Sequence, residues 1–142
     1  MTLIDANLLL YAYVPSSKHH EAVRAWLEAK FSESEPVGLP WVVLLAFMRI
    51  STNPRILERP LSIEEANQIV SAWLARTNVI VLNPGDSHWE ILQNLLAEGQ
   101  AIGPLVTDAH LAALALEHGA TLATADRDFA RFPGVKLLNP LS

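Results

Sequence analysis

Along the first part of the chain, short continuous apolar runs alternate with segments in which apolar residues recur at helical spacing. Thr2–Ile4 reads as a buried strand, and the apolar segment Leu8–Val14 after it favours a helix. A Pro15–Ser17 turn follows, and apolar side chains then return at helical spacing over residues 22–27 with charged residues between them. The pattern therefore predicts a strand and two helices, the second of them amphipathic.

A weak strand at 36–39 precedes a third predicted helix. Pro40 suits the start of a helix, and the apolar run after it continues to Ile50. We expect this helix to be buried on most sides and to stop near Asn53–Pro54, because proline lacks an N–H group and restricts the residue before it.

Two Ser-x-x-Glu sequences predict helix starts in the middle of the chain. Ser62 with Glu65 forms one predicted capping box, and Ser87 with Glu90 forms the other; an apolar stripe follows each. Between the two helices, Val79–Leu82 is rich in β-formers and short, which predicts a central strand.

The last third predicts one more helix and two strands. Thr107 or Asp108 is expected to cap a helix over Ala109–His118, and Thr121–Ala123 and Val135–Leu138 are expected to be strands. Strands that alternate with helices, and that are apolar enough to be buried on both faces, indicate an α/β fold with a mainly parallel central sheet flanked by helices.

Composition supports one packed domain over residues 1–142. The chain is 51% hydrophobic and 18% charged, unlike disordered sequences, and it has no internal repeat. It contains no cysteine, so disulfides and thiolate metal sites are excluded, and a reducing cytoplasm fits. No basic leader precedes Thr2, and the apolar run 41–48 is too short for a membrane span, so we expect a soluble, cytoplasmic protein.

Aspartates stand where ligands bind in parallel sheets. Asp5 follows the first strand, Asp126 follows a later one with Asp128 beside it, and Asp108 opens a helix. Since the carboxyl ends of parallel strands meet at one edge, three segments can bring carboxylates together. Taken singly, Asp5 and Asp108 also suit helix caps, and Asp126 and Asp128 suit a solvated turn.

Crowded carboxylates repel one another unless a cation neutralises them. Oxygen-only ligands favour Mg²⁺ or Mn²⁺, and the lack of cysteine, or of histidine at metal-binding spacing, disfavours zinc. Such an ion supports phosphodiester hydrolysis. The formal charge of −5 argues against broad electrostatic binding of nucleic acid, although local arginines can still form a basic rim.

The chain resembles a PIN domain, specifically a bacterial toxin of the VapC type. Three blocks carry the resemblance: Leu3–Ala12, Thr107–Ala115 and Gly119–Phe129, with Thr-x-Asp-x-Asp-Phe late in the chain as the most specific part. By this likeness Asp5 and Asp108 are metal ligands, Asp126 and Asp128 complete the acidic centre, and Thr124 and Asn7 orient ligands or water.

The same likeness implies an activity and partners. Toxins of this type are metal-dependent endoribonucleases that act on transfer or ribosomal RNA, form homodimers and are silenced by an antitoxin. Candidate phosphate contacts, each of which also suits ordinary surface solvation, are Arg49, Arg55, Arg59, Arg127 and Arg131. An antitoxin arginine in the acidic pocket would be a physically sensible inhibitor.

One position departs from the family. Many members have a glutamate three residues before the arginine equivalent to Arg49, where this chain has Ala46. We expect a metal site with fewer protein ligands and more water, and the alternative is a weakened PIN fold that binds RNA or a partner without cutting. A haloacid-dehalogenase-type phosphatase is a further alternative. It would require an aspartate at the position of Asn7 and a lysine in the middle of the chain, and this chain has neither.

Histidines and tryptophans suggest no second chemistry. The five histidines lie near helix ends, where surface roles are expected, and His110 is not expected to be catalytic because residues two apart do not share a helical face with Asp108. The four tryptophans lie in apolar stripes, so we expect packing in the core or at a dimer interface; they are Trp26, Trp41, Trp73 and Trp89.

Overall fold

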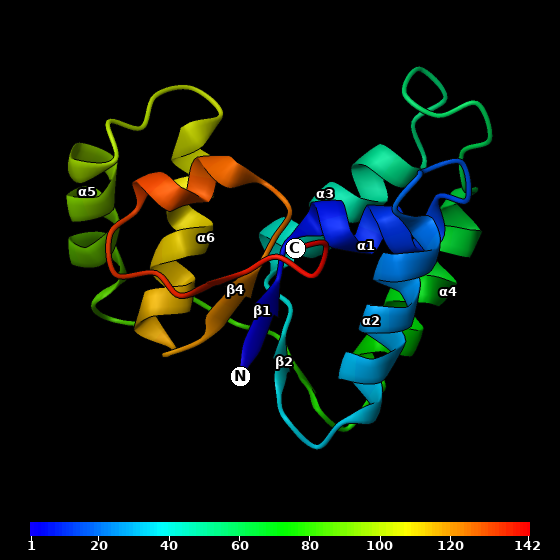
Figure 1. The fold of residues 1–142 in the computed structure, drawn as a ribbon, viewed down its shortest axis with the longest axis horizontal. Helices are drawn as coiled ribbons and strands as arrows, with labels where there is room; N and C mark the ends of the chain where they lie inside the picture. The colour runs from blue at the N-terminus through cyan, green and yellow to red at the C-terminus, as the bar shows by residue number, and fades with distance from the viewer.

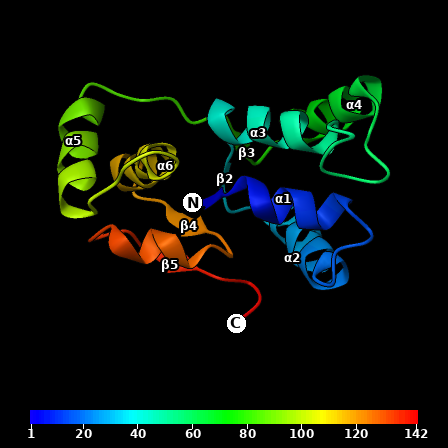
Figure 2. The same ribbon diagram turned by 90° about the horizontal axis from the view of Figure 1, so that it is seen from above.

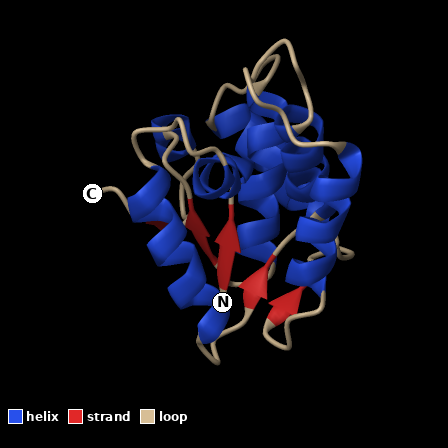
Figure 3. Ribbon diagram, turned by 90° about the vertical axis from the view of Figure 1, so that its right-hand side faces the viewer, coloured by secondary structure: helices blue, strands red, loops and turns tan.

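A five-stranded parallel sheet runs through the protein, for which a computed structural model describes residues 1–142. The strands lie in the order β3-β2-β1-β4-β5, and every neighbouring pair is parallel. In Figure 3 the strand arrows in view point the same way. Their bounds are β1 (Thr2–Ile4), β2 (Val37–Gly38), β3 (Val79–Ile80), β4 (Thr121–Ala123) and β5 (Leu137–Leu138). The predicted α/β fold with a parallel sheet is confirmed.

Helices flank the sheet in two groups. Figures 1 and 2 show α5 and α6 together on one side of β1 and β4, and α1 to α4 on the other side. The bounds are α1 (Ala6–Tyr13), α2 (His20–Ser32), α3 (Trp41–Ser51), α4 (Ile63–Leu74), α5 (His88–Glu98), α6 (Leu105–Glu117) and the 3₁₀ helix η1 (Arg127–Arg131). No helix is long and apolar enough to cross a membrane.

The core is centred on β1, β4 and the inward-facing aromatic side chains of α1, α3 and α4. Trp73 is 2% exposed, and its ring centroid lies 4.7 Å from that of Phe47 and 5.5 Å from that of Tyr13. By contrast, Trp41 and Trp89 are 50% and 65% exposed. The four tryptophans therefore do not share one role, because Trp73 alone is fully enclosed while these two lie on the surface.

The central-strand prediction for 79–82 is wrong. Only Val79 and Ile80 pair, and β3 lies at the edge of the sheet, where Ile80 is 43% exposed. The predicted strand at 135–138 likewise shrinks to two residues at the opposite edge. A short apolar strand can have the same composition at the centre of a sheet and at its edge. Strand order therefore depends on contacts that the local sequence does not encode.

Two predicted helix starts also differ. Helix α6 begins at Leu105 after Pro104, so Asp108 is its fourth residue and neither Thr107 nor Asp108 is a cap. Proline fixes φ in the helical range and needs no N–H partner, which favours the earlier start. At α5, Ser87 makes no capping hydrogen bond because its backbone is not extended; at α4, the predicted capping box of Ser62 and Glu65 is confirmed.

Candidate metal centre at the ends of β1 and β4

The pairing of β1 with β4 fixes the first corner of the site. Ile4 lies opposite Ala123, so the chain leaves both strands at the same level, and the Asp5 N–H donates to the Ala123 carbonyl over 2.9 Å. The next residue after Ala123 is Thr124, whose hydroxyl donates to Asp5 Oδ2 over 2.7 Å. Strand register therefore places the Asp5 carboxylate against the end of β4.

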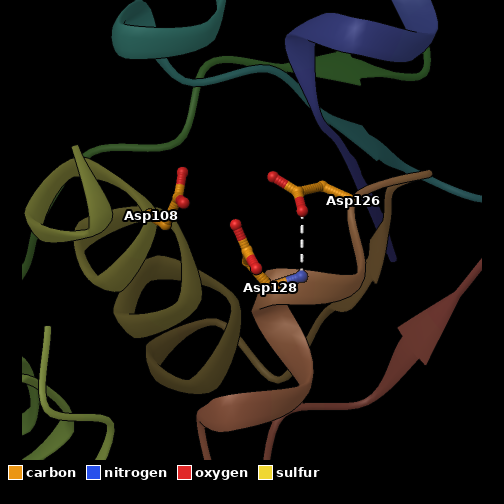
Figure 4. Close-up of side chains that lie close together, drawn as sticks. All are labelled: Asp108, Asp126 and Asp128. Carbon is orange, nitrogen blue, oxygen red and sulfur yellow. Dashed lines mark hydrogen bonds between the residues drawn. The ribbon is translucent and has the colours of Figure 1, made fainter.

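Thr124 also holds the segment that follows β4. Its hydroxyl oxygen accepts a hydrogen bond from the Asp126 N–H over 3.0 Å, and the residue is 3% exposed. Asp126 in turn caps η1, because its Oδ1 accepts from the Asp128 N–H over 2.9 Å (Figure 4). One buried hydroxyl thus connects the end of β1 to the turn that carries both later aspartates.

Asp108 reaches the same place from α6. This helix leads into β4, so its first turns lie near the end of β4 from which Asp126 projects. Carboxylate oxygens of Asp108, Asp126 and Asp128 lie within 4.8 Å of one another, and Figure 4 shows the three side chains around a common space. Helix α6 and the turn after β4 therefore form one acidic cluster.

Asp5 lies beside this cluster rather than within that group of three. Its Oδ1 accepts the Ala6 N–H over 2.8 Å, so Asp5 is the cap of α1 as well as the partner of Thr124. Burial raises the pKa of Asp5; the Thr124 and Ala6 hydrogen bonds oppose that shift, and repulsion from Asp126 adds to it. Asp5 is thus electrostatically coupled to the cluster.

Asp108 has a raised pKa in this cluster. Burial raises the pKa of Asp108 to about 6, with further contributions from the charges of Asp126, Asp5 and Asp128, while Arg131 opposes the shift. A cation bound nearby would stabilise the ionised form of this carboxyl group.

The donor set fits a hard divalent ion. All the clustered groups are carboxylates, which suit magnesium, manganese or calcium better than softer metals. In addition, Asn7 Oδ1 is buried without a hydrogen-bond partner, two residues after Asp5. An amide oxygen left without a donor there is suited to a water molecule of an ion's hydration shell.

Among the five candidate arginines, only Arg131 acts on Asp108 electrostatically. Its Nε donates to the Asp128 carbonyl over 3.2 Å and its Nη1 donates to the Gly99 carbonyl over 3.0 Å. A Cβ at Gly99 would lie 2.8 Å from the Phe132 ring, so glycine lets the end of α5 approach closely. Arg131 therefore connects η1 to the end of α5, although all five arginines have exposed positions.

The surface role expected for His88 and His110 is wrong. His88 Nε2 lies 2.9 Å from His110 Nδ1, and His88 Nδ1 lies 3.1 Å from Glu117 Oε2. The other oxygen of Glu117 accepts the Gly85 N–H over 2.7 Å. These contacts hold α5 against α6. The seven-residue spacing of His110 and Glu117 along one helix face was the signal that could have shown it.

Comparison with known proteins assigns the family. The PIN domain family profile matches residues 2–135. The chain belongs to the PIN-domain family. It is 43% identical over 140 residues to Ribonuclease VapC37 of Mycobacterium tuberculosis, covering 99% of this chain and 97% of that protein. The resemblance to VapC proteins is thereby confirmed, and the haloacid dehalogenase alternative has no support.

Solved structures give the same PIN fold at low sequence identity. VapBC2 from Rickettsia felis, bound to a promoter DNA fragment, matches with a TM-score of 0.69 at 21% identity, covering 97% of both chains. VapC20 of Mycobacterium tuberculosis, a sarcin-ricin loop cleaving toxin, matches with a TM-score of 0.67 at 17% identity, covering 96% of this chain and 99% of that one. These two likenesses concern the fold alone.

Replacing Thr124 by valine tests the hydroxyl bridge. Thr124→Val keeps the side-chain shape but leaves Asp5 Oδ2 and the Asp126 N–H without that partner. We expect a loss of about 1–3 kcal/mol in urea unfolding and a further rise in the pKa of Asp5, measured by NMR titration of its carboxyl carbon. Thr124→Ser, which retains the hydroxyl, should match the wild type. An unchanged Asp5 titration in Thr124→Val would contradict the bridge.

The raised pKa of Asp108 predicts how the stability of the metal-free protein depends on pH. The folded state binds this proton more tightly than the unfolded chain, whose ordinary value is 3.8, so the contribution of Asp108 to stability decreases as pH rises through about 6. In EDTA, Asp108→Asn should be more stable than wild type at pH 8, by on the order of 1 kcal/mol after solvent screening, with a smaller difference at pH 4.

The matched control for this measurement is Asp86→Asn, which removes an exposed carboxylate outside the cluster. Urea unfolding of the three proteins at both pH values separates local repulsion from net charge. If Asp86→Asn and Asp108→Asn stabilise the protein equally at pH 8, repulsion within the cluster is not the cause.

Proposed function

We propose that this chain is a metal-dependent endoribonuclease, the toxic component of a type II toxin-antitoxin module. The observation that carries the proposal is the meeting of Asp108, Asp126 and Asp128 beside Asp5, in a chain that is 43% identical to a VapC ribonuclease. The absence of cysteine is consistent with a reducing, cytoplasmic setting.

The four aspartates have distinguishable roles in this proposal. Asp5 and Asp108 are ligands to Mg²⁺ or Mn²⁺, while Asp126 and Asp128 complete the acidic centre from the η1 turn. When bound there, a divalent cation supplies a water of lowered pKa and neutralises charge on a phosphoryl oxygen. Thr124 keeps Asp5 and Asp126 in fixed relation, and Arg131 and the Asp126 cap hold the η1 backbone.

The raised pKa of Asp108 supports this assignment. Without a cation, the carboxylates repel one another and Asp108 retains its proton to about pH 6. The same carboxylates would serve as oxygen ligands for a cation. Ion binding would therefore be coupled to the loss of the Asp108 proton. The site therefore favours cation binding above pH 6.

A second candidate is a PIN fold that binds RNA or a partner without cutting. Ala46 favours it, because this residue stands where many family members have a glutamate and supplies no carboxylate. Since Mg²⁺ keeps much of its water shell, the remaining aspartates are nevertheless sufficient ligands, and we favour the enzyme.

The proposed partners come from the likeness to VapC proteins. RNA of the transfer or ribosomal class is the substrate, and the inhibitor is a cognate antitoxin that places an arginine among the aspartates, since its planar fork pairs with carboxylates. A homodimer is proposed from the likeness to VapC proteins, with exposed Trp41 or Trp89 as candidate contact residues.

Catalysis is tested with purified protein and total RNA. We expect cleavage with Mg²⁺ or Mn²⁺, none in EDTA, and a loss of at least a hundredfold in initial rate for Asp5→Asn and Asp108→Asn. Asp86→Asn should cleave like the wild type. Cleavage that persists in EDTA would refute the metal mechanism, whereas a wild type that binds RNA but never cuts with either ion would favour the second candidate.

Self-association is tested by the mass of the free protein in solution. Light scattering after gel filtration should give twice the mass of one chain at micromolar concentration. A mass equal to one chain at all concentrations tested would contradict the homodimer.

A further inference from the structure

A pocket of about 380 Å³ lies where β4 and β5 end. Strand register explains its position, because Ala123 lies opposite Leu138 and the Thr124 N–H donates to the Leu138 carbonyl over 2.9 Å. The chain therefore leaves both strands at the same level, at the edge of a parallel sheet where ligands usually bind. The residues that line this β4–β5 pocket include Thr124, Asp126, Arg127, Ala130 and Asn139.

The β4–β5 pocket adjoins the acidic cluster. Asp126, whose carboxylate belongs to the cluster, also lines the pocket. Thr124, which bonds to Asp5 and to the Asp126 N–H, lines it as well. The pocket and the cluster thus share a wall, so a strand with one phosphate at the cluster can place a neighbouring phosphate in the pocket.

Arg127 is the only cation that lines the pocket, and its charge is unpaired. It stands between Asp126 and Asp128 in the sequence and is exposed. It forms no ion pair in the protein. Arg131, by contrast, donates to two backbone carbonyls and opposes the raised pKa of Asp108. The Arg127 guanidinium therefore remains available to a ligand.

The C-terminal turn fixes the side-chain amide of Asn139. Its Oδ1 accepts the Leu141 N–H over 3.0 Å, and its backbone carbonyl accepts the Ser142 N–H over 3.1 Å. Because a backbone N–H can only donate, the turn holds the amide oxygen and leaves the Nδ2 hydrogens without a partner in the protein. The Nδ2 atom is not buried. Asn139 and Arg127 therefore both offer donors, which suits an anion.

The charge pattern at the end of the chain favours a polyanion at this place. The whole chain has 10 Lys and Arg residues against 15 Asp and Glu residues. Residues 127–142 reverse this balance, with Arg127, Arg131 and Lys136 against one acidic side chain, Asp128. Since the phosphates of a nucleic acid are attracted to locally basic surface, RNA finds favourable charge on this side of the cluster.

We propose that the β4–β5 pocket holds the RNA phosphate next to the one that is hydrolysed, through the Arg127 guanidinium and the Asn139 amide. The planar fork of an arginine suits two phosphate oxygens, and the amide donates to a phosphate oxygen as well. Ala130 has only a methyl group, which leaves room for this group. The proposal rests on the ribonuclease function above and adds to it a second anion site that positions the strand.

The test removes the charge from either partner of this contact. In one RNA, a linkage beside the mapped cleaved bond is an uncharged methylphosphonate; the sugar before it is 2′-deoxy in both substrates, so that only the charge differs. On one side of the cleaved bond, the neutral linkage should lower kcat/KM of the wild type about tenfold, chiefly through KM. Arg127→Gln should lower kcat/KM for the charged RNA by a similar factor and lose little more on the neutral RNA.

Asn139→Asp tests the second donor without loss of the turn. The new carboxylate still accepts the Leu141 N–H but repels a phosphate. Urea unfolding should match that of the wild type, and kcat/KM for the charged RNA should fall at least as far as in Arg127→Gln. The neutral linkage should restore part of this loss, because it removes the repulsion. A normal kcat/KM in Asn139→Asp would contradict its place in the contact.

The matched control is Arg24→Gln, which removes an exposed arginine of α2 outside the pocket. It should cleave both RNAs like the wild type. If Arg24→Gln loses as much activity as Arg127→Gln, net charge is the cause and the proposal is wrong. The proposal is also wrong if the neutral linkage lowers kcat/KM of Arg127→Gln as much as that of the wild type, or if it has no effect on the wild type.

A binding measurement separates this proposal from the ribonuclease proposal. The NMR signals of the Arg127 Nε–H and Asn139 Nδ2 groups are followed while the charged RNA is added in EDTA, which prevents metal-dependent cleavage. Shifts at both groups, in a protein that cuts no RNA with Mg²⁺ or Mn²⁺, would support the pocket and refute the ribonuclease. Cleavage without such shifts, and without an effect of the neutral linkage, would do the reverse.

Discussion

The site depends on one buried hydroxyl between two parallel strands. Thr124 donates to Asp5 at the end of β1 and accepts from the amide of Asp126 after β4. A hydroxyl is suited to this position because it can donate and accept at once, which no apolar side chain of the same shape can do. The strand register Ile4↔Ala123 brings the partners close enough to use it.

The arrangement that brings the carboxylates together also destabilises them. Burial and mutual repulsion raise the pKa values of Asp5 and Asp108, so the metal-free protein retains protons that isolated aspartates would lose. Such crowding is unfavourable for the fold alone and is relieved by a divalent cation. Together with the orphaned Asn7 amide oxygen, this electrostatic imbalance is the strongest structural support for an ion at the site.

Residues outside the cluster hold its elements in place. Arg131 connects the η1 backbone to the end of α5, and the absence of a side chain at Gly99 allows that approach. At the other end of α5, His88 contacts His110 and Glu117 of α6. Helix α5 contributes no aspartate, yet it contacts both segments that carry the three clustered aspartates.

Local sequence predicted the elements better than their places. Periodicity gave the helices, and the Ser62 box gave the start of α4, because both depend on neighbours within a few residues. It failed for β3, which lies at the edge, and for α6, which starts at Leu105. Strand order and the choice between competing helix starts depend on distant contacts.

By itself, the sequence determined which groups could act: aspartates after two strands and on one helix, no cysteine, and an alanine at position 46. These are matters of residue identity and local pattern. The tertiary structure decided that Asp108, Asp126 and Asp128 share one space, that Asp5 is bonded to Thr124 beside them, and that Ala46 lines a groove. Those outcomes depend on strand register and helix packing, which join residues more than a hundred positions apart through contacts of a few ångströms.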